Sequence, residues 1–136
     1  MDFSTYLFFN GQCAEAFNFY EQCLGGKVQA MTYAGSPMES TIPADWRDKI
    51  IHARLTVGDQ TLMGSDPPPG HYQKPQGFSV SIGVNDVAEG ERIFNRLSEG
   101  GTLTMPYQKT FWAAGFGMCV DRFGIAWMVN CEQGDK

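Results

Sequence analysis

The chain has 136 residues, of which 43% are hydrophobic, and this size and composition favour one soluble domain with a core of its own. Its formal net charge is -5, and the ten lysines and arginines are scattered, so it lacks the clustered basic face that nucleic-acid binding requires. No apolar run approaches the roughly 18 residues needed to cross a bilayer, and the N-terminus lacks the basic flank of a signal peptide. We therefore expect a cytoplasmic protein with neither a nucleic acid nor a membrane as partner.

The four cysteines show no Cys-x-x-Cys spacing, and two of them lie inside apolar runs. They are Cys13, Cys23, Cys119 and Cys131. Reduced thiols packed in the core are expected for such residues in a cytoplasmic protein.

The first half of the chain begins with an aromatic-rich run at residues 3–9 that is typical of a strand. Apolar residues then recur at helical spacing over 14–24, up to a Gly-Gly stop, and a second strand is predicted at 27–33. Residues 35–46 carry two prolines and indicate a long irregular loop. Two β-branched runs flanking a Gly-Asp connection predict a β-hairpin over 50–66.

The second half repeats this order, with strands predicted at 77–84 and 102–107 on either side of a helix at 87–98. Asn85 or Asp86 would cap that helix. A loop is expected at 108–115. The chain ends in a second hairpin, whose last strand covers residues 124–131.

The two halves therefore describe one β-α-β-β-β unit written twice, with an offset of 75 residues between Gly26 and Gly101. We predict a single domain made of a first module at 1–66, a proline-rich linker at 67–76 and a second module at 77–136. Each longer strand has one apolar face and one small or polar face. Such strands form a sheet that helices cover on the outside and that curves around a cavity on the inside.

Four segments together resemble the PhnB-like branch of the vicinal oxygen chelate superfamily, which includes relatives of glyoxalase I. They are YLFFNGQCAEAFNFY at 6–20, the HARL run that starts at His52, GDQTLMGSD at 58–66 and DRFGIAWMVN at 121–130. The resemblance implies an α+β fold in which paired modules form an eight-stranded, curved mixed sheet around a pocket, commonly in a homodimer. Many members are called 3-demethylubiquinone 3-methyltransferases.

In the metal-dependent relatives, four strand positions supply His and Glu ligands to a divalent ion. The matching positions here are Ser4, Met63, Ser79 and Met128. None of these side chains is an ordinary ligand for zinc, nickel, iron or manganese. A register slip of one residue would not restore a ligand set. We therefore expect neither a metal nor a cofactor.

His52 is the one good candidate for a catalytic base, and Arg54 lies beside it on the same strand face, where it could bind an anionic group. The structural alternative is that both residues pair with a carboxylate such as Asp66, or with a loop carbonyl. Aromatic residues from strands and loops offer a similar choice, between a cavity wall and core or dimer contacts. They are Tyr6, Phe8, Trp46, Phe111 and Trp112.

These observations favour a metal-free protein that binds a small organic molecule, whose identity the sequence leaves open. The expected ligand-binding residues are Ser4, Tyr6, Phe8, His52, Arg54, Met63, Ser79, Trp112, Met128 and Asn130. One alternative is a metal-dependent lyase, isomerase or dioxygenase of the same superfamily, and another is a dimeric interaction module whose cavity is filled. A homodimer is expected, and the long linker would also allow subunits to exchange modules.

Overall fold

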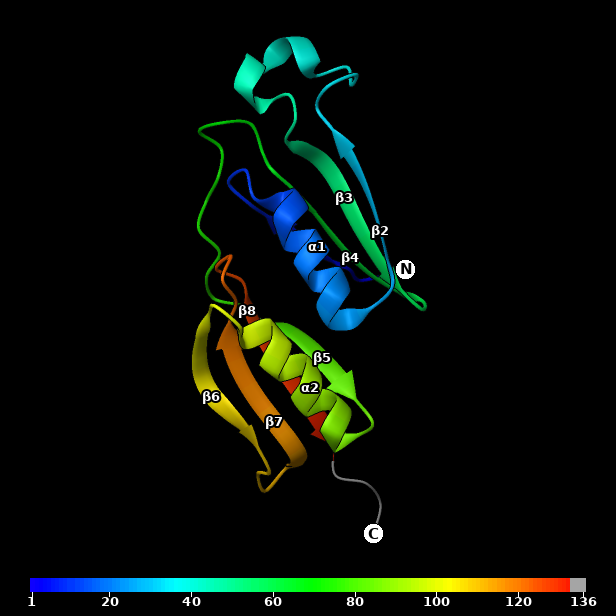
Figure 1. The fold of residues 1–136 in the computed structure, drawn as a ribbon, viewed down its shortest axis with the longest axis vertical. Helices are drawn as coiled ribbons and strands as arrows, with labels where there is room; N and C mark the ends of the chain where they lie inside the picture. The colour runs from blue at the N-terminus through cyan, green and yellow to red at the C-terminus, as the bar shows by residue number, and fades with distance from the viewer. Residues whose placement is uncertain (133–136) are drawn as a thin grey trace. The chain divides into compact units, whose positions relative to one another are not determined.

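The computed structural model describes residues 1–132 and divides the chain into two compact units, Met1–Lys74 and Pro75–Lys136 (Figure 1). The division falls inside the predicted linker at 67–76. Each unit holds one helix and four strands in the order β-α-β-β-β. The duplicated pattern that the sequence predicts is therefore present in the structure.

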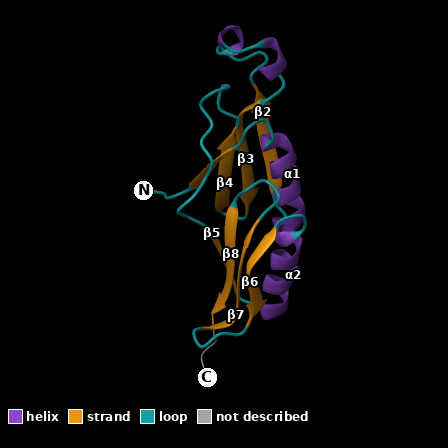
Figure 2. Cartoon of the chain, turned by 90° about the vertical axis from the view of Figure 1, so that its left-hand side faces the viewer, coloured by secondary structure: helices purple, strands orange, loops and turns teal. Residues whose placement is uncertain are grey.

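The first unit is a four-stranded sheet with one helix against it. Its elements are β1 (Thr5–Phe8), α1 (Cys13–Leu24), β2 (Lys27–Thr32), β3 (Ile50–Val57) and β4 (Gln60–Ser65). The strand order is β1-β4-β3-β2, with β1 parallel to β4 and the other pairs antiparallel. Helix α1 lies against one face of this sheet and leaves the other face uncovered by any helix of the unit (Figure 2).

The second unit has the same topology. Its elements are β5 (Val80–Val84), α2 (Val87–Ser98), β6 (Thr102–Gln108), β7 (Ala113–Val120) and β8 (Ala126–Glu132). The strand order is β5-β8-β7-β6, and β5 runs parallel to β8. The predicted α+β class with paired modules and helix-covered sheets is confirmed. Within residues 1–132 the eight strands hydrogen-bond as two sheets of four.

Two predicted segments differ from the structure. The loop at 35–46 contains two short 3-10 helices, Glu39–Thr41 and Ala44–Trp46. Strand β7 begins at Ala113, inside the segment expected to be a loop, because a tight turn closes there. In that turn Thr110 N donates to Ala113 O and Ala113 N donates to Thr110 Oγ1, both at 3.0 Å.

Each helix buries an apolar stripe against its own sheet. On α1, Phe17 and Tyr20 are buried, and the Phe17 ring meets Phe9 edge-on at 6.1 Å between centroids. On α2, Gly90 interrupts the apolar stripe, and a side chain there would overlap the Tyr107 hydroxyl. Asp86 caps α2 by accepting a hydrogen bond from Glu89 N at 2.9 Å, as one of the two predicted caps.

All four cysteines are free and buried, so the predicted reduced core thiols are confirmed, and Trp127 is only 1% exposed. The Trp127 indole Nε1 donates to the Asp121 carboxylate at 2.8 Å. No helix within residues 1–132 combines the length and the hydropathy required to cross a bilayer.

Candidate functional site

The helix-free face of the first sheet collects most of the residues that the sequence nominated. Strand pairing places Tyr6 on β1 opposite Met63 on β4, and Met63 opposite Arg54 on β3. His52 lies two residues before Arg54, so it projects from the same face. Phe8 shares that face with Tyr6 and is 49% exposed. The first unit therefore presents five of the predicted residues together.

Tyr6 and His52 are in direct contact across the intervening strand β4. The Tyr6 hydroxyl lies 3.2 Å from His52 Nδ1, and their ring centroids are 5.8 Å apart. The Phe8 ring lies 5.2 Å from that of Tyr6 on the other side. The three rings thus form a continuous aromatic surface with one hydroxyl and one imidazole in it.

Arg54 has no acidic partner in this part of the structure. Its Nη2 lies 3.7 Å from the thioether sulfur of Met63, which is a weak acceptor. No carboxylate oxygen within residues 1–132 comes within 4.0 Å of its guanidinium. The positive charge is exposed beside the aromatic surface and is available to an anion.

The alternative that Asp66 pairs with His52 or Arg54 is wrong. Asp66 is fully buried, and its Oδ1 accepts from Gly11 N at 2.8 Å and Cys13 N at 3.0 Å. Its Oδ2 accepts from Ile50 N at 3.0 Å. The carboxylate is therefore used to fasten the β1–α1 connection and the start of β3 to the end of β4.

The helix-free face of the second sheet carries a row of methionines. Met105 on β6 pairs with Met118 on β7, which pairs with Met128 on β8. All three side chains are half-buried. Flexible, polarisable thioethers adapt to irregular apolar ligands, so this row suits a binding surface as well as a core.

Two further predicted residues, Asn130 and Trp112, lie beside the methionine row. Asn130 follows Met128 by two residues on β8, so it shares the same face, and it pairs with Phe116 on β7. Its Oδ1 is buried without a hydrogen-bond partner among the described residues. The Trp112 ring meets that of Phe116 edge-on at 5.4 Å and is 47% exposed. The second unit therefore brings together Met128, Asn130 and Trp112.

Two predicted residues lie off the strands to which they were assigned. Ser4 immediately precedes β1 and is exposed, and Ser79 immediately precedes β5 and is half-buried. Sequence reasoning missed Met105, Met118 and Phe116. The alternation in FGMCV at 116–120 contained the signal for two of them, because it puts Phe116 and Met118 on the face opposite Gly117 and Cys119.

The described part of the chain contains no group of three His, Cys, Asp or Glu side chains placed to hold a metal ion. Burial, with a smaller contribution from the Asp66 carboxylate, holds the pKa of the Cys13 thiol well above its ordinary range. Burial likewise raises the pKa of Cys119. These two thiols are therefore protonated at neutral pH and unsuited to nucleophilic chemistry.

The β-α-β-β-β fold of the modules is that of the glyoxalase-like α+β proteins. A glyoxalase/bleomycin resistance protein/dioxygenase family enzyme from Burkholderia phytofirmans PsJN shares the fold, with a TM-score of 0.63 at 14% identity over 96% of this chain and 97% of that one. The family model described as 3-demethylubiquinone-9 3-methyltransferase matches residues 1–130. The chain belongs to this family.

Three other proteins resemble this chain over nearly its whole length. Protein PA1353 from Pseudomonas aeruginosa, a crystal structure, is 54% identical with a TM-score of 0.89 and coverage of 98% of this chain and 99% of that one. Protein YjdN of Escherichia coli (strain K12) is 32% identical over 139 residues, which span 96% of this chain and 95% of that protein. A putative 3-demethylubiquinone-9 3-methyltransferase, PhnB protein, from Bacillus cereus is 21% identical, with a TM-score of 0.77 and coverage of 96% and 99%.

Proposed function

We propose that this chain binds a small organic anion with an aromatic or other planar body, and that the helix-free face of the first sheet is the site. The observation that carries the proposal is the exposed Arg54 guanidinium, which faces no carboxylate in residues 1–132 and lies beside the aromatic surface of Tyr6, Phe8 and His52. A cation next to exposed rings matches a ligand that has an oxyanion at one end and a planar body at the other.

Each side chain has a defined part in this proposal. Arg54 donates to the oxyanion, and the rings of Tyr6 and Phe8 pack on the planar body. When the Tyr6 hydroxyl donates to His52 Nδ1, the neutral imidazole carries its proton on Nε2 and offers a donor to the ligand. In the second unit, the thioethers beside Trp112 and Asn130 supply the same kind of adaptable apolar surface.

Binding of this kind needs no divalent ion, because Arg54 supplies the positive charge that a metal supplies to vicinal oxygens in other members of the superfamily. His52 is the residue that could transfer a proton if the bound molecule reacts. The proposal is therefore a metal-independent ligand site with His52 as its candidate base.

Thermal shift and calorimetry with benzoate, phenylphosphonate and neutral benzamide test this site, each with and without EDTA. We expect the two anions to stabilise the protein, benzamide to have little effect, and EDTA to change nothing. Arg54→Gln should abolish the stabilisation, while Arg92→Gln on the exposed side of α2 should preserve it as the matched loss of charge. Equal responses of the two variants, or binding that EDTA removes, would reject the proposal.

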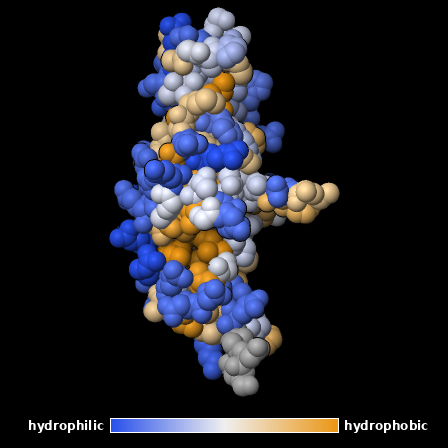
Figure 3. All heavy atoms as spheres, turned by 90° about the vertical axis from the view of Figure 1, so that its right-hand side faces the viewer, coloured by the Kyte–Doolittle hydropathy of each residue, from blue (hydrophilic) through white to orange (hydrophobic). Residues whose placement is uncertain are grey.

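We also propose that the chain forms a homodimer, because large apolar side chains are exposed on its surface. Phe3 and Phe111 are 94% and 91% exposed, and Met31 is 60% exposed. Figure 3 shows one face of the molecule on which hydrophobic residues gather and are bordered by hydrophilic ones. Apolar exposure of this kind is typical of surfaces that a partner covers. Sedimentation equilibrium should give twice the 15.1 kDa chain mass, and a monomer across the concentration range would contradict it.

A further inference from the structure

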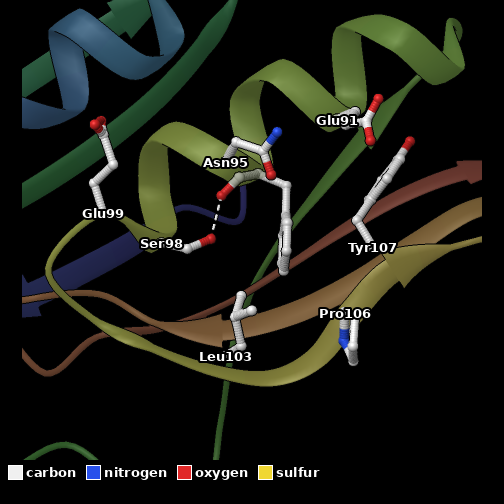
Figure 4. Close-up of a pocket in the computed structure, with 8 residues that line it drawn as sticks. Glu91, Asn95, Ser98, Glu99, Leu103, Pro106 and Tyr107 are labelled. Atoms are coloured by element: carbon white, nitrogen blue, oxygen red, sulfur yellow. Dashed lines mark hydrogen bonds between the residues drawn. The ribbon is translucent and has the colours of Figure 1, made fainter.

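A groove on the helix side of the second unit lies between α2 and β6, away from the sheet face discussed above. Its volume is about 370 Å³. Figure 4 shows Asn95 and Ser98 projecting from α2 and Leu103 and Pro106 from β6 opposite them. The remaining lining residues are Glu91, Phe94, Glu99 and Tyr107.

The floor of this groove is apolar and partly exposed. Leu103 is 56% exposed although it is a large aliphatic residue on a strand. The Phe94 and Tyr107 rings lie 5.7 Å apart at 33°, so they pack side by side beneath the helix. Pro106 removes a backbone donor from β6, which further lowers the polarity of the lower wall. The groove therefore offers an apolar track to a ligand with an aliphatic body.

The rim of the groove is acidic at both ends. Glu91 lies at the end where the Tyr107 hydroxyl is found, and Glu99 lies at the other end (Figure 4). The helical span from Glu91 to Ser98 covers about 10 Å along the axis at about 1.5 Å per residue, and Glu99 follows Ser98 as the C-terminal cap of α2. No lysine, arginine or histidine is among the lining residues, and neither carboxylate forms an ion pair within residues 1–132, although Arg122 Nε donates to the backbone oxygen of Glu99 at 3.2 Å.

We propose that this groove binds an elongated diamine, a molecule with two ammonium groups joined by an aliphatic chain, and this goes beyond the anion site proposed above. One ammonium pairs with Glu91 and lies near the electron-rich face of Tyr107, and the other pairs with Glu99. The aliphatic chain covers Leu103 and Pro106. The side-chain amide of Asn95, which lies on α2 between Glu91 and the capping Glu99, adds a polar contact at mid-length.

Tyr107 provides an internal reporter for this occupant. Burial is the largest cause that raises the pKa of its hydroxyl. The nearby Cys131, Glu91 and Asp86 raise this pKa further, by smaller amounts. An ammonium bound at Glu91 would neutralise part of that negative field, so the Tyr107 pKa should fall when the groove is filled. A ligand that binds elsewhere on the chain would leave it unchanged.

The test is an NMR titration of the whole chain with octamethylenediamine at low ionic strength. We expect shift changes at the Asn95 side-chain amide and the Leu103 methyls, and a fall in the Tyr107 pKa. Octylamine, with one charge, and tetramethylenediamine, which is too short to reach both acids, should bind more weakly. The neutral diol of the same length should not bind. Raising the salt concentration should weaken the complex, because exposed charges are screened.

Charge-neutralising variants decide between local pairing and general attraction to an acidic protein. Glu91→Gln and Glu99→Gln should each weaken octamethylenediamine about two- to five-fold, which is the range for exposed ion pairs. Glu89→Gln removes the same charge from the same helix outside the groove and should have no more than a slight effect. Equal effects of the three variants, or a diamine no tighter than octylamine, would overturn the proposal.

Discussion

The hydroxyl of Tyr6 lies 3.2 Å from His52 Nδ1, and this contact joins strands β1 and β3 across the strand that separates them. Because the pair lies on an exposed face, it contributes more to the orientation of the imidazole than to the stability of the fold. Any ligand that uses His52 Nε2 depends on that orientation.

Tyr6→Phe should therefore change the imidazole of His52 while it leaves the fold intact. We expect the free energy of unfolding to change by less than about 1 kcal/mol, because the lost hydrogen bond is exposed to water. The nitrogen NMR shifts of His52 should move towards a more equal mixture of tautomers. Tyr72→Phe, which removes a hydroxyl from the linker, is the control, and the same His52 spectrum in both variants would show that the contact has no effect in solution.

Asp66→Asn should destabilise the first unit strongly. The native carboxylate accepts from three backbone N–H groups in a fully buried position, and the amide would present a donor to at least one of them. We expect a loss of about 3 kcal/mol in urea unfolding, which follows from losing charge-assisted hydrogen bonds in the interior. Asp59→Asn in the exposed β3–β4 turn should cost less than about 0.5 kcal/mol. Similar losses for both variants would contradict this role of Asp66.

Gly117→Ala should destabilise the second unit because helix α2 packs directly on that strand position. A methyl group there would lie 2.8 Å from the Phe94 ring and 2.9 Å from the Tyr107 backbone, well inside ordinary contact distance. We expect a loss of about 1–3 kcal/mol in urea unfolding, the usual cost of overpacking. Gly83→Ala on β5 is the matched control, since no atom lies within 4 Å of the added methyl. A loss for Gly83→Ala as large as that for Gly117→Ala would argue against the close packing.

The sequence predicts the fold well because its strongest signals are local. Helical spacing before a Gly-Gly stop and β-branched runs around a Gly-Asp turn each depend on neighbouring residues, and all produced the observed elements. Asp66 was misassigned because its partners, Gly11 and Ile50, are distant along the chain and use backbone groups that every residue has. No pattern of side chains in the sequence predicts hydrogen bonds from backbone N–H groups to a distant carboxylate.

The candidate site divides in the same way. Strand alternation correctly placed His52 and Arg54 on one sheet face, since side-chain direction in a strand repeats every two residues, and the strand pairing adds Met63 to that face. The sequence did not predict that Met105 and Met118 lie side by side, because this depends on the register between strands. Strand β6 carries irregularities that shift its pairing with β7. The groove between α2 and β6 was not predicted either, because it depends on how far the helix covers the edge of its sheet, which is a feature of tertiary packing.

Because of its buried thiols, the free energy of unfolding of the protein should fall as the pH becomes alkaline. The pKa of Cys13 is held well above its ordinary value of 9.0, by burial first and by the Asp66 carboxylate second. In the unfolded chain this thiol ionises as the pH rises through about 9, whereas in the native state it stays protonated, so alkali favours unfolding. The stabilisation is thus complete below the unfolded pKa and is lost progressively above it.

Burial raises the pKa values of Cys119, Tyr33 and Tyr107 as well, and these groups add to the decline with the same sign. Urea unfolding between pH 8 and pH 10 should therefore show a falling free energy in the native chain. Cys13→Ala should show a shallower decline, because one of the groups that ionise only on unfolding has been removed. Leu55→Ala, which removes a buried side chain that does not titrate, is the control for a loss of core packing and should keep the steeper slope. If Cys13→Ala declined in parallel with the native chain, the ionisation of this thiol on unfolding would not contribute to the pH dependence.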